Sequence, residues 1–270
     1  EEVLAVVLQA TNGKKAKSWF KYAEIEFWQQ WYRELEVAMW YSRKSDRIDG
    51  STGRPVKSFP GIQEQLEDSH THKYSTLSAK LLEEFLMDIF YSRVKPGEGR
   101  HIQAWTGEYG MLEFNRVVEE WATGSGFLKN IEITTEKTKS PHHTNALSAG
   151  HKFTEFKMAN GAILTLNHNP LYDNRSLHTE IDPITGKPVE SMRFTFLDLA
   201  GNNGNSNIQM VTKKDAYKFW YVDGGVSHLG PKVNASAAHG GEYYEMHVSD
   251  HRGIHIDDIT KCGELILARN

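Results

Sequence analysis

The sequence predicts an α+β fold in which helices come first and strands follow, and three observations support this class. Between Ser18 and Tyr41 there is no Gly or Pro, and apolar residues recur every three or four positions, which is the period of an α-helix. In the second half, short apolar runs are separated by turn residues, and Asn160-Gly161 is the clearest hairpin signal. The composition, 39% hydrophobic and 24% charged over 270 residues, is typical of a globular chain and not of a disordered or membrane-spanning one.

Charge and cysteine content narrow the functional classes. The formal net charge is −4 with a pI near 6.4, so the chain as a whole is not a basic nucleic-acid binder. One cysteine, Cys262, excludes an internal disulfide framework and a four-cysteine zinc site. No initiator Met and no signal peptide open the sequence, and we expect a processed protein or the ordered part of a longer one.

The first predicted elements are a strand and a long aromatic helix. The strand is the apolar run Val3 to Leu8, and the helix extends from Ser18 to Tyr41. Additional aromatic residues widen its apolar stripe beyond that of an ordinary surface helix, so the helix needs neighbours on several sides, including other subunits. The stripe that we expect to pack within or between subunits comprises Phe20, Phe27, Trp31 and Leu35.

A loop, two helices and a strand are predicted next. The polar stretch Ser45 to Pro60 carries several Gly and Pro residues and is predicted to be a loop. A helix from Thr76 to Ser92 follows, with Ser75 or Thr76 as its cap and Pro96-Gly97 as its stop. The run His101 to Trp105 alternates like a strand, and the run Tyr109 to Thr123 has helical periodicity and ends at Gly124.

The second half is predicted to consist of strands. A hairpin is expected around Asn160-Gly161, formed by Phe153 to Met158 and Ala162 to Leu166. Apolar or alternating runs predict five further strands, at Met192 to Leu197, Ile208 to Val211, Ala216 to Val222, Tyr243 to Val248 and Gly263 to Ala268.

Histidines provide the one candidate metal site. His247, His251 and His255 are spaced by four, and Asp257 is nearby, which on a helix would align metal ligands on one face. The β-branched residues and Gly253 between them favour a strand, a turn and a strand instead, so we expect a hairpin with exposed histidines. His142-His143 lies in a polar run predicted to be a surface loop. No nucleotide loop or hydrolase motif is present, and we predict neither a cofactor nor catalysis.

The order of elements from Trp19 to Trp121 resembles the major capsid protein of tailed double-stranded DNA phages, the Hong Kong ninety-seven type fold. In that family a long spine helix leads into a loop rich in Gly and Pro, and a mixed α/β axial domain follows. The amino-acid sequences of three segments are similar to those of the capsid proteins of crAss-like phages: Ala38-Met39-Trp40-Tyr41, Phe59-Pro60-Gly61-Ile62 and Trp105-Thr106-Gly107-Glu108-Tyr109-Gly110. The family also carries an N-terminal arm and an extended β loop before the spine helix, which are expected to lie upstream or to be cleaved, disordered or absent from this chain.

The resemblance implies a division of the chain and a set of partners. Residues 1–48 would form the peripheral-domain part with the spine helix, 49–255 the axial domain with a strand-rich insertion, and 256–270 a return strand to the peripheral domain. Copies of the chain would assemble as hexamers and pentamers into an icosahedral head, located in the virion and built in the host cytoplasm. Auxiliary or decoration proteins and a portal are further expected partners, and DNA would be enclosed without sequence-specific binding. Gly61, Gly107 and Gly110 are expected to hold turns that Ala would strain.

The sequence leaves two other functional classes open. The first is a metal-dependent hydrolase or lyase that uses His247, His251 and Asp257. The second is a phage tail or receptor-binding module, a class that usually shows internal repeats, which are not found in this sequence.

Overall fold

The computed structural model describes residues 3–9, 15–48, 50–51, 53–91, 100–124, 155–157, 161–200, 206–227, 230–231 and 238–268. The chain forms two compact units, one from Glu1–Ile208 with Ile256–Asn270 and the other from Gln209–His255. The second unit corresponds to part of the strand-rich insertion expected within residues 49–255. No division appears at the predicted boundary between residues 48 and 49. No described helix is long and apolar enough to cross a bilayer.

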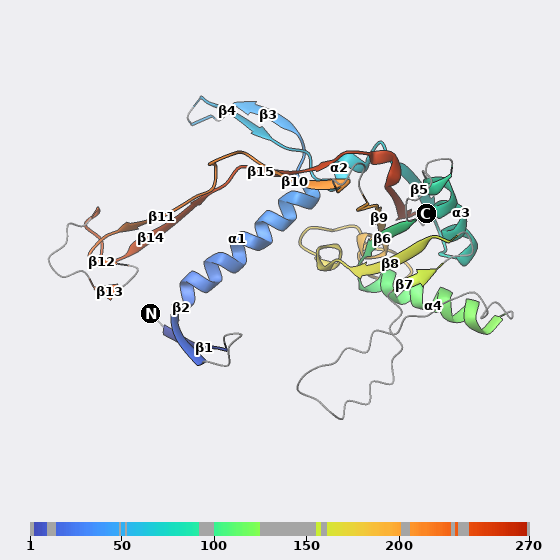
Figure 1. Cartoon of the computed structure of the whole chain (residues 1–270), viewed down its shortest axis with the longest axis horizontal. Helices are drawn as coiled ribbons and strands as arrows, with labels where there is room; N and C mark the ends of the chain where they lie inside the picture. Colours follow the sequence, from blue (N-terminus) through green and yellow to red (C-terminus); the bar gives the residue numbers. More distant parts are fainter. Residues whose placement is uncertain are drawn as a thin grey trace. The chain divides into compact units, whose positions relative to one another are not determined.

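The N-terminal segment is a hairpin followed by the aromatic helix (Figure 1). Strand β1 (Val3–Gln9) pairs antiparallel with β2 (Lys15–Lys21), and α1 (Tyr22–Tyr41) follows directly. The prediction of a helix from Ser18 was therefore wrong over its first turn, and Phe20 lies in β2 opposite Leu4 instead of on the helix. A run without Gly or Pro suits a strand as well as a helix, and β1 gives this segment a backbone partner.

A second correction concerns the predicted loop Ser45 to Pro60, which contains a hairpin. Strand β3 (Ser45–Ile48) pairs antiparallel with β4 (Pro55–Ser58), and Gly53 in the connection has a φ of +62°. Both strands are largely exposed, so the hairpin needs no apolar face. Because neither face is buried, the hairpin has the polar composition of a loop, and its residues lack the apolar alternation from which strands are predicted.

A six-stranded mixed sheet forms the centre of the first unit. Its order is β5 (His70–Tyr74), β16 (Gly263–Leu267), β9 (Phe194–Leu197), β6 (His101–Thr106), β8 (Ile163–His168) and β7 (Glu155–Lys157). β16 runs parallel to β5 and β6 parallel to β8, whereas the other pairs are antiparallel. The predicted hairpin around Gly161 is confirmed by the β7–β8 pairing. β16, expected to return to residues 1–48, lies between β5 and β9 of this sheet.

Strand β5 and the short helix α2 (Ile62–Leu66) were not predicted from the sequence. β5 is an edge strand with one buried residue, Tyr74, so it lacks the apolar alternation that marked the central strands. Three short 3₁₀ turns also connect elements of this unit: η2 (Pro170–Asp173), η3 (Val189–Met192) and η4 (Ile259–Lys261).

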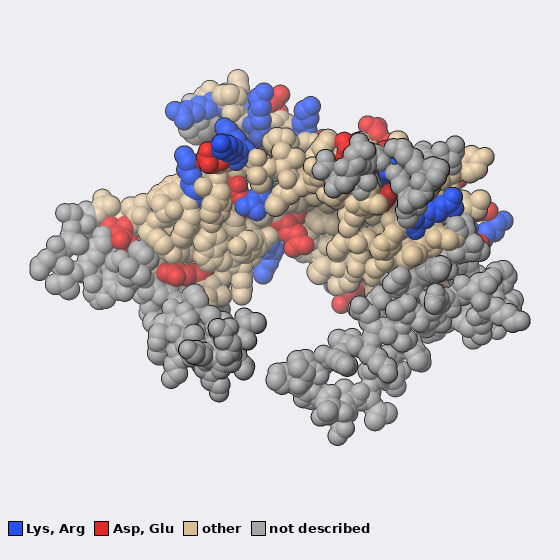
Figure 2. All heavy atoms as spheres, viewed as in Figure 1, with Lys and Arg blue, Asp and Glu red and all other residues tan. Residues whose placement is uncertain are grey.

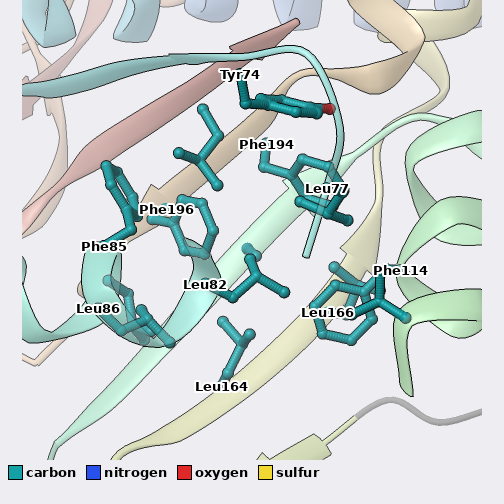
Figure 3. Close-up of a cluster of buried hydrophobic side chains, with 14 of the residues drawn as sticks. Tyr74, Leu77, Leu82, Phe85, Leu86, Phe114, Leu164, Leu166, Phe194 and Phe196 are labelled. Carbon is teal, nitrogen blue, oxygen red and sulfur yellow. The ribbon is translucent and has the colours of Figure 1, made fainter. Parts of the chain in front are cut away.

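Helices α3 (Ala79–Phe90) and α4 (Glu108–Gly124) contribute to the hydrophobic core with the sheet. The cap of α3 is Ser78, whose side chain accepts a hydrogen bond from the Leu81 N–H at 3.3 Å, so the predicted caps Ser75 and Thr76 were wrong. Figure 3 shows Phe85 and Leu86 of α3 and Phe114 of α4 beside the sheet side chains. Phe194 and Phe196 are fully buried at the centre of this core.

The second unit is built from nested strand pairs, each of which encloses the next along the chain. β10 (Ile208–Thr212) pairs with β15 (Arg252–Ile256), β11 (Lys218–Asp223) with β14 (Tyr244–Ser249), and β12 (Val226–Ser227) with β13 (Gly230–Pro231). The strands predicted at Ile208, Ala216 and Tyr243 are thus confirmed. The expected hairpin between the His247 and His255 strands was wrong, because each of these strands pairs with an earlier one.

Candidate functional site

The C-terminal end of helix α1 packs against residues of the six-stranded sheet and of η2 within the first unit. Trp40 is 8% exposed, and its ring centroid lies 6.2 Å from that of Trp105 and 5.7 Å from that of Tyr172. The next residue, Tyr41, makes a 3.1 Å hydrogen bond with His178. The predicted stripe residues Phe27, Trp31 and Leu35 are only half-buried. A broad apolar surface on α1 therefore remains available to a partner.

The chain passes very close to this anchor at Gly61, the first of the three glycines singled out in the sequence. A Cβ on Gly61 would lie 2.8 Å from the carbonyl oxygen of Trp40 and 2.9 Å from the nitrogen of Ser42. The Gly61 N–H donates to the Ser42 carbonyl at 2.7 Å. Its φ of −75° is ordinary, so the need for glycine arises from the close backbone approach and not from a left-handed turn.

Gly107 and Gly110 are placed where a carboxylate caps α4. Both oxygens of Asp173 accept the Glu108 N–H, at 3.0 and 3.1 Å, and the Ser191 hydroxyl accepts the Tyr109 N–H at 3.2 Å. A Cβ on Gly107 would lie 2.6 Å from Asp173 Oδ1 and 2.7 Å from Ser191 Oγ. A Cβ on Gly110 would collide with the Thr106 hydroxyl. The absence of side chains at both positions therefore lets Asp173 and Ser191 reach the start of the helix.

A largely buried charged cluster comprises Glu190 on η3, Arg193 between η3 and β9, and Glu264 on β16, and we call these three residues the charged triad. Arg193 Nη1 is 2.9 Å from Glu264 Oε2, and Arg193 Nε is 2.7 Å from Glu190 Oε1. The Thr195 hydroxyl donates to Glu264 at 3.2 Å, and the Gln63 amide donates to Glu190 at 2.9 Å. Two carboxylates thus share one guanidinium, and hydrogen bonds occupy part of their remaining capacity.

Burial determines the electrostatics of the charged triad. It raises the pKa of Glu264, although the Arg193 charge and the Thr195 hydrogen bond act in the opposite direction. For Arg193, burial alone would lower the pKa, but Glu264 and Glu190 raise it above its ordinary value. The pKa values of Tyr41 and Tyr172 are raised, chiefly by burial. The two carboxylates therefore keep the Arg193 guanidinium charged, as in a structural ion pair.

An open pocket of about 420 Å³ borders the charged triad. Arg193, Glu264 and Tyr41 line it together with the exposed ion pair Arg43–Glu67, whose atoms are 3.6 Å apart. The lining carries charges of both signs.

The predicted histidine cluster is not brought together as a metal site. Within the described ranges, no group of three or more His, Cys, Asp or Glu side chains is arranged to hold a metal ion. His247 lies on β14, where its ring stacks on Trp220 at 5.2 Å and its Nε2 is 3.2 Å from Glu245. His251 lies between β14 and β15, and His255 on β15. His142-His143 falls outside the described residues.

Sequence reasoning missed Asp173, Ser191 and the charged triad. One signal for the triad was available: Glu264 begins the apolar run Leu265 to Leu267, and Arg193 directly precedes the run Phe194 to Leu197. Opposite charges at the starts of two buried strands predict a pairing if those strands are neighbours, but the neighbour relation is set by the topology. Asp173 offered no such signal, because it lies far along the chain from the helix that it caps.

Two comparisons with known proteins give consistent results. Residues 1–270 match the family described as Crassvirus major capsid protein. Over 196 residues, which is 68% of this chain, the sequence is 30% identical to the major capsid protein of Bacteroides phage crAss001. The matched region amounts to 39% of that relative's length.

Proposed function

The chain belongs to the Crassvirus major capsid protein family, and from this premise we propose that it is a structural subunit that self-assembles into the icosahedral head enclosing the phage's double-stranded DNA. The match to the family over residues 1–270 carries this proposal. Copies of the chain would form hexamers and pentamers, with auxiliary or decoration proteins and a portal as further partners. The protein would reside in the virion after assembly in the host cytoplasm.

In this proposal the fold is of the Hong Kong ninety-seven type, and α1 is its spine helix. The order of α1, a Gly- and Pro-containing hairpin, α3, β6 and α4 supports this assignment. Residues 1–48 would belong to the peripheral domain and 49–255 to the axial domain, whereas 256–270 would join the axial sheet through β16. Gly61, Gly107 and Gly110 would preserve the joints between these elements by admitting a close neighbour.

Association, not turnover, would be the activity of this protein. The half-exposed aromatic stripe on α1 supports this view, since a shell subunit must bury apolar surface against its copies. The net charge of −4 suits a capsid wall that encloses DNA without binding its phosphate backbone strongly along its length.

Electron microscopy of the purified protein over a concentration series tests the proposal. Rings, hexamers or shells are expected, and a dispersed monomer at high concentration would contradict it. Metal analysis after dialysis provides an independent check, because stoichiometric retained zinc, iron or manganese would favour a metal-dependent enzyme instead.

A further inference from the structure

The β3–β4 hairpin is an exposed and strongly cationic projection of the first unit. Between residues 43 and 57 there are five basic residues (Arg43, Lys44, Arg47, Arg54 and Lys57) and two acidic ones (Asp46 and Asp49), a formal charge of +3. Figure 2 shows Lys and Arg side chains gathered over this hairpin. Lys57 pairs with Asp46 at 3.7 Å, whereas among the described residues Arg47 and Arg54 form no ion pair. Lys44 likewise has no side-chain ion pair with a described residue, so three cations of this segment are left to face a partner.

The same hairpin also exposes apolar side chains. Ile48 is 76% exposed and Val56 is 49% exposed, and Phe59, just beyond β4, is 60% exposed. Ile48 is opposite Pro55, and Val56 is opposite Arg47, so both faces combine an apolar residue with a charged one. An isolated two-stranded hairpin is at best marginally stable in water. A contact that covers apolar and cationic groups together suits a protein partner better than a phosphate backbone.

Helix α1 has the complementary properties. It carries Glu24, Glu26, Glu34 and Glu36 against one basic residue, Arg33, a formal charge of −3. Glu34 lies three residues after Trp31 and seven after Phe27, so it borders the half-exposed aromatic stripe. Exposed Glu26 lies two turns earlier, about 12 Å along the axis from Glu34.

We propose that the β3–β4 hairpin of one copy packs across the half-exposed aromatic side of helix α1 in a second copy, with Arg47 and Arg54 facing the α1 glutamates. Because the two surfaces differ, the contact is head-to-tail, and such contacts form rings when the rotation closes. The proposal rests on the proposed function in that it names a contact through which subunits associate.

Charge exchange between two variants tests the contact directly. The hairpin variant Arg47→Glu/Arg54→Glu and the helix variant Glu26→Lys/Glu34→Lys each place like charges across the contact. Sedimentation velocity at low salt is expected to show self-association of each variant weakened about ten-fold. An equimolar mixture of the two variants is expected to regain association, because each hairpin then meets a helix of opposite charge.

A matched control is Lys213→Glu/Lys214→Glu, which makes the same change of charge at two exposed residues of the second unit. This variant is expected to associate like the parent. Parent-like association of the hairpin variant, or failure of the mixture to recover, would overturn the contact while leaving the proposed function intact. Loss of binding to a DNA duplex with unchanged self-association would overturn it in favour of a nucleic-acid surface. A parent protein that stays monomeric would overturn both proposals.

Discussion

At the scale of single residues, the contacts around Gly107 explain why this turn requires glycine although its backbone is not left-handed. Asp173 and Ser191 approach the first N–H groups of α4 through the space that a side chain at residue 107 would fill. The requirement is therefore steric and comes from residues distant in sequence.

Replacing Gly107 with Ala is expected to destabilise the protein by about 1–3 kcal/mol, because the new methyl group displaces Asp173 or Ser191. Urea unfolding measures the change. Gly240→Ala is the control, since a Cβ there meets nothing within 4 Å. Equal stability of the two variants would contradict the steric argument.

The charged triad predicts a larger effect. Glu264→Gln leaves Arg193 with a buried and incompletely paired charge, so a loss of about 3–5 kcal/mol in unfolding free energy is expected. Glu84→Gln, which removes the exposed ion pair with Lys80, is expected to cost less than about 1 kcal/mol. A loss below about 1 kcal/mol at Glu264 would contradict a stabilising role for the triad.

Cys262 gives a pH-dependent prediction. Burial raises the pKa of its thiol from 9.0 to about 12, so the fold favours the neutral thiol. The stability contributed by that neutral thiol is complete below pH 9 and is lost as the pH rises toward 12. The advantage of the parent over Cys262→Ser in urea unfolding should thus shrink by about 2 kcal/mol between pH 8 and pH 10.5. A pH-independent difference would show that the thiol ionises freely in the folded state.

At the scale of elements, sequence patterns located those with a buried face. The central strands β6, β8 and β16 and the helices α3 and α4 were predicted because burial imposes periodicity on their residues. The β3–β4 hairpin and β5 were missed because their residues are mostly exposed, so hydrogen bonding alone defines them. The start of α1 was misplaced for a related reason: residues before Tyr22 form a strand because β2 pairs with β1, and the local sequence pattern does not show this pairing.

The candidate site was predictable only in part. Sequence reasoning identified the glycines and the aromatic helix, which are marked by residue type and spacing. Asp173 and Ser191, whose close approach requires glycine at residue 107, come from η2 and η3. They become neighbours of Gly107 only through the topology of the fold.

The second unit offers an element-scale prediction. Asp257 N–H donates to the Asn207 carbonyl at 2.9 Å, so the two ends of the Gln209–His255 segment are held together within the first unit. Replacing residues 209–255 with a two-residue Asn-Gly turn is expected to leave a first unit that unfolds cooperatively with nearly unchanged helix content. Circular dichroism during thermal unfolding measures this, and a non-cooperative or unfolded product would contradict the division.

At the scale of the whole molecule, the chain combines a well-packed sheet core with surface that its own fold leaves exposed. The core side chains are buried within the first unit, whereas the stripe on α1 and the residues of the β3–β4 hairpin are half-buried or exposed. The two surfaces carry opposite charge. A subunit that folds independently and is completed by its copies accounts for both properties.

The most direct test of this account is the mass distribution of the purified protein, measured by sedimentation velocity from low to high concentration and followed by electron microscopy. The account predicts a concentration-dependent shift from single chains to closed rings or shells. A single sedimenting monomer over the whole range, with no particles in the images, would contradict it.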